Sequence, residues 1–197
     1  LYQQKYQPDL VFTEFVRVQT QTRKRVAKNE LSDIQDHDVT LPLVVQLIGN
    51  DPAALTEAAV LLQAQEVEHI NLNLGCPYGR MTSGATGGEL LRQPHLLAMM
   101  LAALRRVCRG SFSVKCRAGY DDVNQWQALL PLFEDSGVDF IVLHPRTVVQ
   151  RYHGTADHRI SAAMAAATSL PVIANGDINT AQDARTLLAR SGVAGLM

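Results

Sequence analysis

The segment Asn71-Leu72-Asn73-Leu74-Gly75-Cys76-Pro77 ends an apolar stretch that begins at His69, and it places a cysteine in a turn of glycine and proline. This arrangement is typical of α/β proteins that present a reactive group, because the strand fixes the position and the loop exposes the side chain. A glycine-rich segment follows at residues 83–88, where the backbone is able to approach a bound group closely. The alternative interpretation is a cysteine half-buried in a tight turn.

Outward from this segment, short apolar stretches alternate with longer amphipathic ones. The predicted strands are Leu10–Val16, Leu43–Ile48, His69–Leu72, Ser113–Cys116, Phe140–Leu143, Pro171–Ala174 and Val193–Met197. The predicted helices are Pro52–Gln65, Pro94–Val107, Val123–Ser136, Ile160–Thr168 and Thr180–Arg190. The polar segment Thr20–Leu41 is expected to be a long loop with room for one short helix. Strands that alternate with helices form parallel sheets through right-handed crossovers.

The order of these elements indicates a (β/α)8 TIM barrel. Seven strands fit this barrel with one strand missing better than a doubly wound sheet, whose dinucleotide fingerprint G-x-G-x-x-G does not occur in the chain. Because the chain starts at Leu1 and stops inside the apolar stretch Val193–Met197, we expect a fragment of a longer protein, residues 1–197 being a partial barrel domain.

Polar side chains recur where the predicted strands end. They are Thr13, Glu14, Gln46, Asn71, Asn73, Cys76, Lys115, Arg117, His144, Arg146, Asn175, Gly176 and Asp177. In a barrel these ends meet on one face, so we expect them to converge on a polar or charged ligand. Lys115 and His144 suit an anionic ring or a phosphate, and the turn at residues 175–178 offers backbone N–H groups. Taken singly, each residue could equally be structural.

Composition limits the class of protein. No apolar run approaches the ~18 residues of a membrane span, and the three cysteines show no paired framework, which is typical of a cytoplasmic, reduced protein. The net charge of −1 gives no general attraction to nucleic acid. Arg23-Lys24-Arg25 with Lys28 is either an RNA contact or a solvated loop. His153 and His158 near Asp157 are more typical of solvated loop residues than of ligands, so no metal is expected.

Several short motifs occur in a fixed order. They are Thr-Glu-Phe-Val from Thr13, Val-Gln-Leu-Ile-Gly from Val45, Asn-Leu-Gly-Cys-Pro from Asn73, Ser-Val-Lys-Cys-Arg from Ser113, Leu-His-Pro-Arg-Thr from Leu143 and Pro-Val-Ile-Ala-Asn-Gly-Asp-Ile from Pro171. Together they resemble the tRNA-dihydrouridine synthases, FMN-dependent barrel enzymes that reduce a uridine of tRNA with NADPH. Thr13–Val18 and Thr82–Leu91 look most like the branch that modifies uridine 16 of bacterial tRNA.

The resemblance implies a role for each matching residue. Gln46, Lys115, His144, Asn175 and Gly176 would contact FMN. Cys76 would donate a proton to the uracil ring, Asn73 and Arg117 would help to hold the base and the flavin region, and Arg146 would meet the RNA. The implied partner is tRNA, and the complete enzyme is expected to be a monomer without a metal or a membrane.

The chain departs from the family pattern in three ways. The family's first strand, with its Pro-Met motif, would precede Leu1, and the Gly-Arg turn after the last strand and the C-terminal helical tRNA-binding domain are expected beyond Met197. Pro145 stands where the family commonly has glycine. The proline ring fixes φ and removes the backbone N–H donor next to Arg146. The 197 residues alone are therefore expected to be poorly stable, largely free of flavin and inactive on tRNA.

Two other functions fit parts of the same pattern. Another FMN barrel oxidoreductase that acts on a small pyrimidine, similar to a dihydroorotate dehydrogenase, would share the cysteine loop and the lysine and asparagine contacts. An inactive RNA-binding fragment is the other alternative. The basic segment Thr20–Lys28 and the complete motif set favour the tRNA enzyme.

Overall fold

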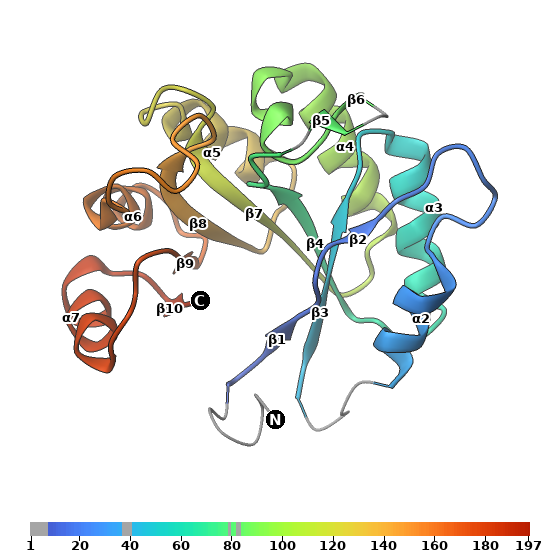
Figure 1. Ribbon diagram of the computed structural model, residues 1–197, viewed down its shortest axis with the longest axis horizontal. Helices are drawn as coiled ribbons and strands as arrows, with labels where there is room; N and C mark the ends of the chain where they lie inside the picture. The colour runs from blue at the N-terminus through green and yellow to red at the C-terminus, as the bar shows by residue number, and fades with distance from the viewer. Residues whose placement is uncertain (1–7, 37–40, 79, 82–83) are drawn as a thin grey trace.

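A computed structural model describes residues 8–36, 41–78, 80–81 and 84–197, and its main feature is one parallel sheet curled around a concave face (Figure 1). The strands are β1 (Val11–Phe12), β2 (Val16–Arg17), β3 (Leu43–Ile48), β4 (His69–Leu74), β7 (Ser111–Gly119), β8 (Phe140–Thr147), β9 (Val172–Ala174) and β10 (Gly195–Leu196). They follow the order β1-β3-β4-β7-β8-β9-β10, and β2 also pairs with β3. This arrangement is a partial (β/α)8 TIM barrel, as predicted.

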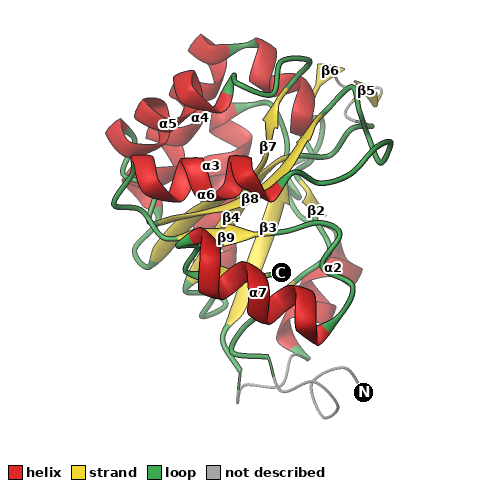
Figure 2. Cartoon of the chain, turned by 90° about the vertical axis from the view of Figure 1, so that its left-hand side faces the viewer, coloured by secondary structure: helices red, strands yellow, loops and turns green. Residues whose placement is uncertain are grey.

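Helices cover the convex side of the sheet (Figure 2). They are α2 (Lys28–Gln35), α3 (Pro52–Gln63), α4 (Pro94–Val107), α5 (Trp126–Asp135), α6 (His158–Ala167) and α7 (Ala181–Ser191). The 3-10 helix η1 (Gly87–Arg92) packs instead against the loop that carries Cys76. Two helices begin at a residue whose side chain caps the first turn. Asp51 accepts a hydrogen bond from the Ala54 N–H at 2.7 Å, and the Thr180 side chain accepts one from Asp183 at 3.1 Å. Among the described helices, none is both long and apolar enough to cross a membrane.

Strict alternation along the strands separates the two faces of the sheet. On β7, Phe112, Val114 and Cys116 are fully buried in the core beneath the helices. Lys115 and Arg117 alternate with them and line the concave side. The parallel register aligns Asn73 of β4 with Lys115. The concave face therefore collects polar side chains at matched heights, whereas the convex face supplies the hydrophobic core.

The first predicted strand, Leu10–Val16, is interrupted in the structure. Its residues form the short strands β1 and β2, which pair with opposite ends of β3. Thr13 still bonds to β3, because its N–H donates to the Val44 carbonyl and its hydroxyl accepts from the Gln46 N–H. Glu14 and Phe15, which follow it, line a cavity on the concave face. Periodicity cannot reveal such a break, because both halves are apolar and extended.

The polar segment after β2 contains helix α2 and a tight loop. Arg25, from the predicted basic cluster, pairs with Glu57 of α3 at 2.7 Å and donates to the backbone carbonyls of Gln19, Thr20 and Thr22. This arginine therefore fixes the loop against α3.

A β-bulge reshapes the end of β8. Arg117 of β7 pairs with His144, but Gly119 pairs with Thr147, so β8 contains one residue more than β7 over this interval. Pro145 lies in this interval, where its missing N–H is tolerated. The proline therefore accompanies a change in strand direction just before the residues that enclose the cavity.

The core packing gives a first testable expectation. Phe133 of α5 is completely buried. Because Phe133→Ala leaves a cavity beneath the sheet, we expect it to lower the free energy of unfolding by about 3–5 kcal/mol. The measurement is urea denaturation of the full-length protein, with unfolding monitored by circular dichroism. Leu188→Ala on α7 is the control, since Leu188 is 46% exposed, and an equal loss in both variants would contradict this assignment of the core.

Candidate active site

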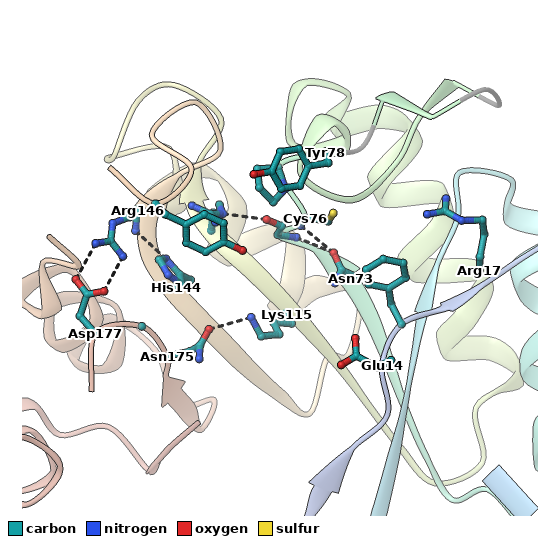
Figure 3. A pocket seen from close by; sticks show the side chains of 16 residues that line it. Glu14, Arg17, Asn73, Cys76, Tyr78, Lys115, His144, Arg146, Asn175 and Asp177 are labelled. Carbon is teal, nitrogen blue, oxygen red and sulfur yellow. Dashed lines mark hydrogen bonds and ion pairs between the residues drawn. The ribbon is translucent and has the colours of Figure 1, made fainter. Parts of the chain in front are cut away.

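A cavity of about 620 Å³ opens on the concave face at the C-terminal ends of the strands (Figure 3). It brings together most of the residues singled out in the sequence. They are Glu14, Asn73, Cys76, Lys115, Arg117, His144, Arg146, Asn175, Gly176 and Asp177. Gln46, a predicted cofactor residue, is not among the residues that line this cavity, but it is hydrogen-bonded to Asn73, which does line it.

The loop that carries Cys76 is fixed from several sides. The side-chain oxygen of Asn73 accepts hydrogen bonds from the N–H groups of Gly75 and Cys76, at 3.2 and 3.0 Å. Arg117 donates through Nε to the Gly75 carbonyl at 2.9 Å, and Gly88 donates to the Cys76 carbonyl at 3.0 Å. Cys76 is partly exposed within this frame.

The glycines after the cysteine loop serve this packing. Gly87 has a φ of +59°, and a Cβ there would lie 2.9 Å from the Cys76 Cβ. A Cβ at Gly88 would lie 2.5 Å from a methyl group of Val148. The close approach expected from the glycine-rich segment is therefore made, within the described residues 84–88, with the protein itself.

A chain of buried amides supports the cavity from below. Gln46 donates to the Asn71 side chain at 2.9 Å and accepts from Asn73 at 2.7 Å, while Asn71 donates to the Ser113 hydroxyl at 2.8 Å. All four side chains are buried, so their polar groups need these partners. The chain fixes the orientation of the Asn73 amide, which in turn fixes the Cys76 loop.

Lys115 and Asn175 meet across the cavity floor. The Lys115 ammonium donates to the Asn175 side-chain oxygen at 2.9 Å, and the Asn175 amide donates to the Met197 carbonyl at 2.9 Å. Burial lowers the pKa of Lys115, and the nearby positive charge of Arg117 acts in the same direction. Two cationic side chains in a partly desolvated site make the floor suitable for an anion.

His144 is a neutral hydrogen-bond donor in this site. Burial lowers its pKa to about 4, and the positive charges of Arg117, Lys115 and Arg146 add to the effect. Its Nδ1 lies 3.3 Å from the Arg146 backbone N–H and accepts from it, which leaves the proton on Nε2. Gly176 keeps the space beside Nε2 open, because a Cβ there would lie 2.7 Å from this nitrogen. The φ of +106° at Gly176 also requires glycine.

Arg146 joins the ends of β8 and β9. Its guanidinium forms a bidentate pair with Asp177 at 2.9 and 2.7 Å and donates to the carbonyls of His153 and Gly154. The Arg146 side chain is only 5% exposed, and the pair holds the pKa of Asp177 below its usual range. Arg146 therefore lines the cavity with most of its hydrogen-bonding capacity directed to the protein.

Cys108, Cys116 and His158 do not line the cavity. Burial raises the pKa of Cys108 to about 11 and that of Cys116 to about 12, so both remain thiols. The His158 ring bonds to the Gly176 carbonyl at 2.7 Å and to the Ser161 hydroxyl at 3.1 Å. In the parts of the chain that the structure describes, no three His, Cys, Asp or Glu side chains are grouped to hold a metal ion.

Sequence reasoning missed the aromatic side chains around the cavity. Phe15, Tyr78 and Tyr152 all line it. Phe15 and Tyr78 lie within two residues of singled-out positions, so adjacency to Glu14 and Cys76 was an available signal. Tyr152 lies in the loop after β8, and its position depends on how this loop folds back over the sheet.

The state of His144 leads to a prediction about pH. Because its folded pKa is about 4 and its ordinary value is 6.5, the unfolded chain gains a proton first as the pH falls between these values. The stability of the folded protein should therefore decline as the pH falls from 6.5 to about 4. NMR titration should place the imidazole midpoint near the lower value, with His144→Asn to assign the resonance. His144→Asn should also lose less stability in this range, and an imidazole that titrates near 6.5 would contradict the assignment.

Comparison with known proteins identifies the family. The family model described as dihydrouridine synthase matches residues 2–197. The chain is 40% identical over 159 residues to a Rhodobacter capsulatus protein named "Probable tRNA-dihydrouridine synthase", covering 80% of this chain and 49% of that protein. It is 36% identical to tRNA-dihydrouridine synthase B of Pseudomonas aeruginosa, covering 79% of this chain and 47% of that protein.

A solved structure shows the same kind of fold. The N-(5'-phosphoribosyl)anthranilate isomerase of Pyrococcus furiosus superposes with a TM-score of 0.54 and 16% identity, over 92% of this chain and 74% of that one. The chain spans about half the length of the curated relatives it matches. Since the family model covers nearly every residue, the chain belongs to the dihydrouridine synthase family.

Proposed function

We propose that this chain forms the flavin- and base-binding part of an enzyme that reduces a uridine of tRNA to 5,6-dihydrouridine with FMN and NADPH. One observation carries the proposal: Lys115, Arg117 and the neutral His144 converge on the same cavity as the partly exposed Cys76. This combination provides positive charge, a hydrogen-bond donor and a proton source around one space.

The donor set fits FMN. Lys115, His144, Asn175 and Gly176 would hold the flavin and its phosphate, because they present an ammonium group, a ring N–H, an amide and an open backbone position to the cavity. The amide of Gln46 already binds Asn71 and Asn73, and its second hydrogen is the group we propose for the flavin. Once bound and reduced by NADPH, the flavin would supply the hydride for C6 of the uracil ring.

Cys76 would complete the reduction by protonating C5 of the uracil. Negative charge develops toward C5 and O4 as C6 is reduced, and an acid near C5 removes it. The neighbouring cations Lys115 and Arg117 would stabilise this charge before the proton arrives. Asn73 would act by keeping Cys76 in place through its two backbone hydrogen bonds.

The RNA would have to present its base outside the stack. A paired or stacked uridine cannot reach a cavity at the strand ends, so the base must be extruded into it. We propose that Arg117 and Arg146 border the base, with Arg146 contributing mainly charge and shape because its guanidinium is bound to Asp177. Binding should weaken as salt rises, since phosphate contacts provide much of RNA affinity.

The most specific part of the proposal is which uridine of tRNA the enzyme reduces. Uridine 16 is the position suggested by the segment that starts at Thr13, whereas several of the relatives described by name are called synthase B. Mapping dihydrouridine in individual tRNAs decides between these assignments. A change at a position other than 16 would overturn the uridine-16 part and leave the enzyme class intact.

The role of Cys76 is tested by restoring activity in cells that lack the gene. Cys76→Ala in the full-length protein should retain FMN but lose turnover on tRNA by about 10²- to 10⁴-fold, the usual contribution of a positioned acid. Nucleoside mass spectrometry of dihydrouridine provides the measurement. The matched control is Cys108→Ala, at the end of α4, which should restore the modification. Wild-type turnover in Cys76→Ala would remove the proton-donor role.

Substitution of Lys115 should affect flavin binding as well as turnover, whereas substitution of Cys76 should affect turnover alone. Lys115→Ala removes the ammonium group on the cavity floor and leaves Asn175 without its donor, so the purified full-length protein should lose bound flavin as well as activity. The flavin-to-protein absorbance ratio measures this loss. Lys24→Ala, at an exposed position on the loop before α2, is the matched control and should keep its flavin. Full flavin content in Lys115→Ala would contradict the proposed contact.

A further inference from the structure

Two tyrosines stand exposed at the mouth of the active-site cavity. Tyr78 follows Cys76 by two residues and is 56% exposed, and Tyr152 in the loop after β8 is 66% exposed. Both line the cavity, and Figure 3 shows Tyr78 beside the cysteine loop. Exposed aromatic rings at the rim of a pocket are typical of contact surfaces, because their burial is completed only by a ligand.

Each ring is paired with a guanidinium group. The Arg151 guanidinium lies 5.4 Å from the centre of the Tyr78 ring, and that of Arg117 lies 5.5 Å from the centre of the Tyr152 ring. The pairs are joined, because the Arg151 carbonyl accepts a hydrogen bond from Arg117 at 2.6 Å. Arg151 adopts a φ of +52°, a conformation that a residue with a side chain rarely adopts without support from its surroundings.

A second cavity of about 570 Å³ continues from the first on the other side of Tyr78. Pro77 and Tyr78 line both spaces, and Tyr120, Val149 and Arg151 line the second. Its acidic side chain, Glu89, accepts a hydrogen bond from the Tyr120 hydroxyl at 2.9 Å and lies 3.7 Å from Arg92. Tyr78 therefore lies between two adjoining spaces. The first is lined by several cationic side chains, and the second by aromatic and aliphatic groups together with the polar side chains of Glu89, Arg151 and His153.

We propose that Tyr78, Tyr152 and Arg151, here called the tyrosine rim, bind the nucleotides next to the target uridine, with one neighbouring base stacked on the face of the Tyr78 ring that Arg151 does not cover. This inference rests on the proposed function. A base that leaves the stack exposes the faces of its neighbours, and any base can stack on an aromatic ring. Arg151 adds positive charge for the phosphates of the same strand. The rim therefore suits unpaired RNA of mixed sequence.

Binding of short RNA tests the tyrosine rim directly. The probes are fluorescein-labelled single-stranded oligoribonucleotides with one central uridine, either with normal neighbours or with abasic neighbours that keep every phosphate. Fluorescence anisotropy with the flavin-loaded full-length protein at fixed salt gives the affinities. Loss of a base stacked on an aromatic ring corresponds to roughly 5- to 150-fold in affinity, so the abasic probe should bind the wild type more weakly by this factor.

The tyrosine variants should then show coupling with the probe. Tyr78→Leu should weaken binding of the normal probe by a similar factor but leave binding of the abasic probe nearly unchanged, because the stacking partner is already missing. Tyr78→Phe keeps the ring and should bind both probes as the wild type does. Met99→Ala on α4 is the control, since Met99 is an exposed apolar residue (63%) that lies outside both cavities.

Two results would overturn the tyrosine rim. One is equal affinity of the wild type for both probes, which needs no variant and so does not depend on the folding of a mutant. The other is additive loss in Tyr78→Leu with the abasic probe. Either result would leave the proposed reduction intact if Cys76→Ala still abolished dihydrouridine in cells. Absence of dihydrouridine formation by the wild type would instead remove the proposed function itself.

Discussion

The hydrogen bonds of the Asn73 side chain connect the buried sheet to the chemistry of the site. Through its amide, Asn73 donates to Gln46 inside the sheet, and through its oxygen it accepts from the backbone of the Cys76 loop. Loss of either end would leave a buried polar group without a partner, which is more costly than the bond itself is favourable. The position of the cysteine is thus set by the register between β3 and β4, where Gln46 faces Asn71.

The electrostatic character of the cavity follows from the same strands. Alternation on β7 places Lys115 and Arg117 on the concave side, and register with β8 brings His144 opposite Arg117. Burial and the nearby positive charges keep the imidazole neutral, so His144 adds a hydrogen-bond donor to the cavity without adding a further charge. A site with this charge favours anionic groups without the repulsion that a protonated histidine would add.

Much of this architecture could be predicted from sequence. Apolar stretches bounded by turns identified β3 and α4 with their observed bounds, Leu43–Ile48 and Pro94–Val107. β3 is an almost uninterrupted apolar stretch, and α4 is a long helix that begins at a proline. The break between β1 and β2 and the bulge near Pro145 were not foreseen, since each depends on how a strand meets its neighbour. For the site, residue type and strand position predicted that polar side chains converge on one face. They did not predict which of these side chains would form hydrogen bonds to the protein itself. The inward bonds of Gln46 and Arg146 arise from partners far away in the sequence.

Arg117 fastens two loops that belong to different strands. Its guanidinium donates to the carbonyl of Gly75 next to the cysteine, to that of Thr147 at the end of β8 and to that of Arg151 in the loop after β8. Neither loop can open without disturbing hydrogen bonds to the same side chain, so local unfolding of the two should be cooperative. The loop that carries Tyr152 and the loop that carries Cys76 are then thermodynamically linked, so ordering of the first stabilises the second by their coupling free energy, and ordering of the second stabilises the first by the same amount.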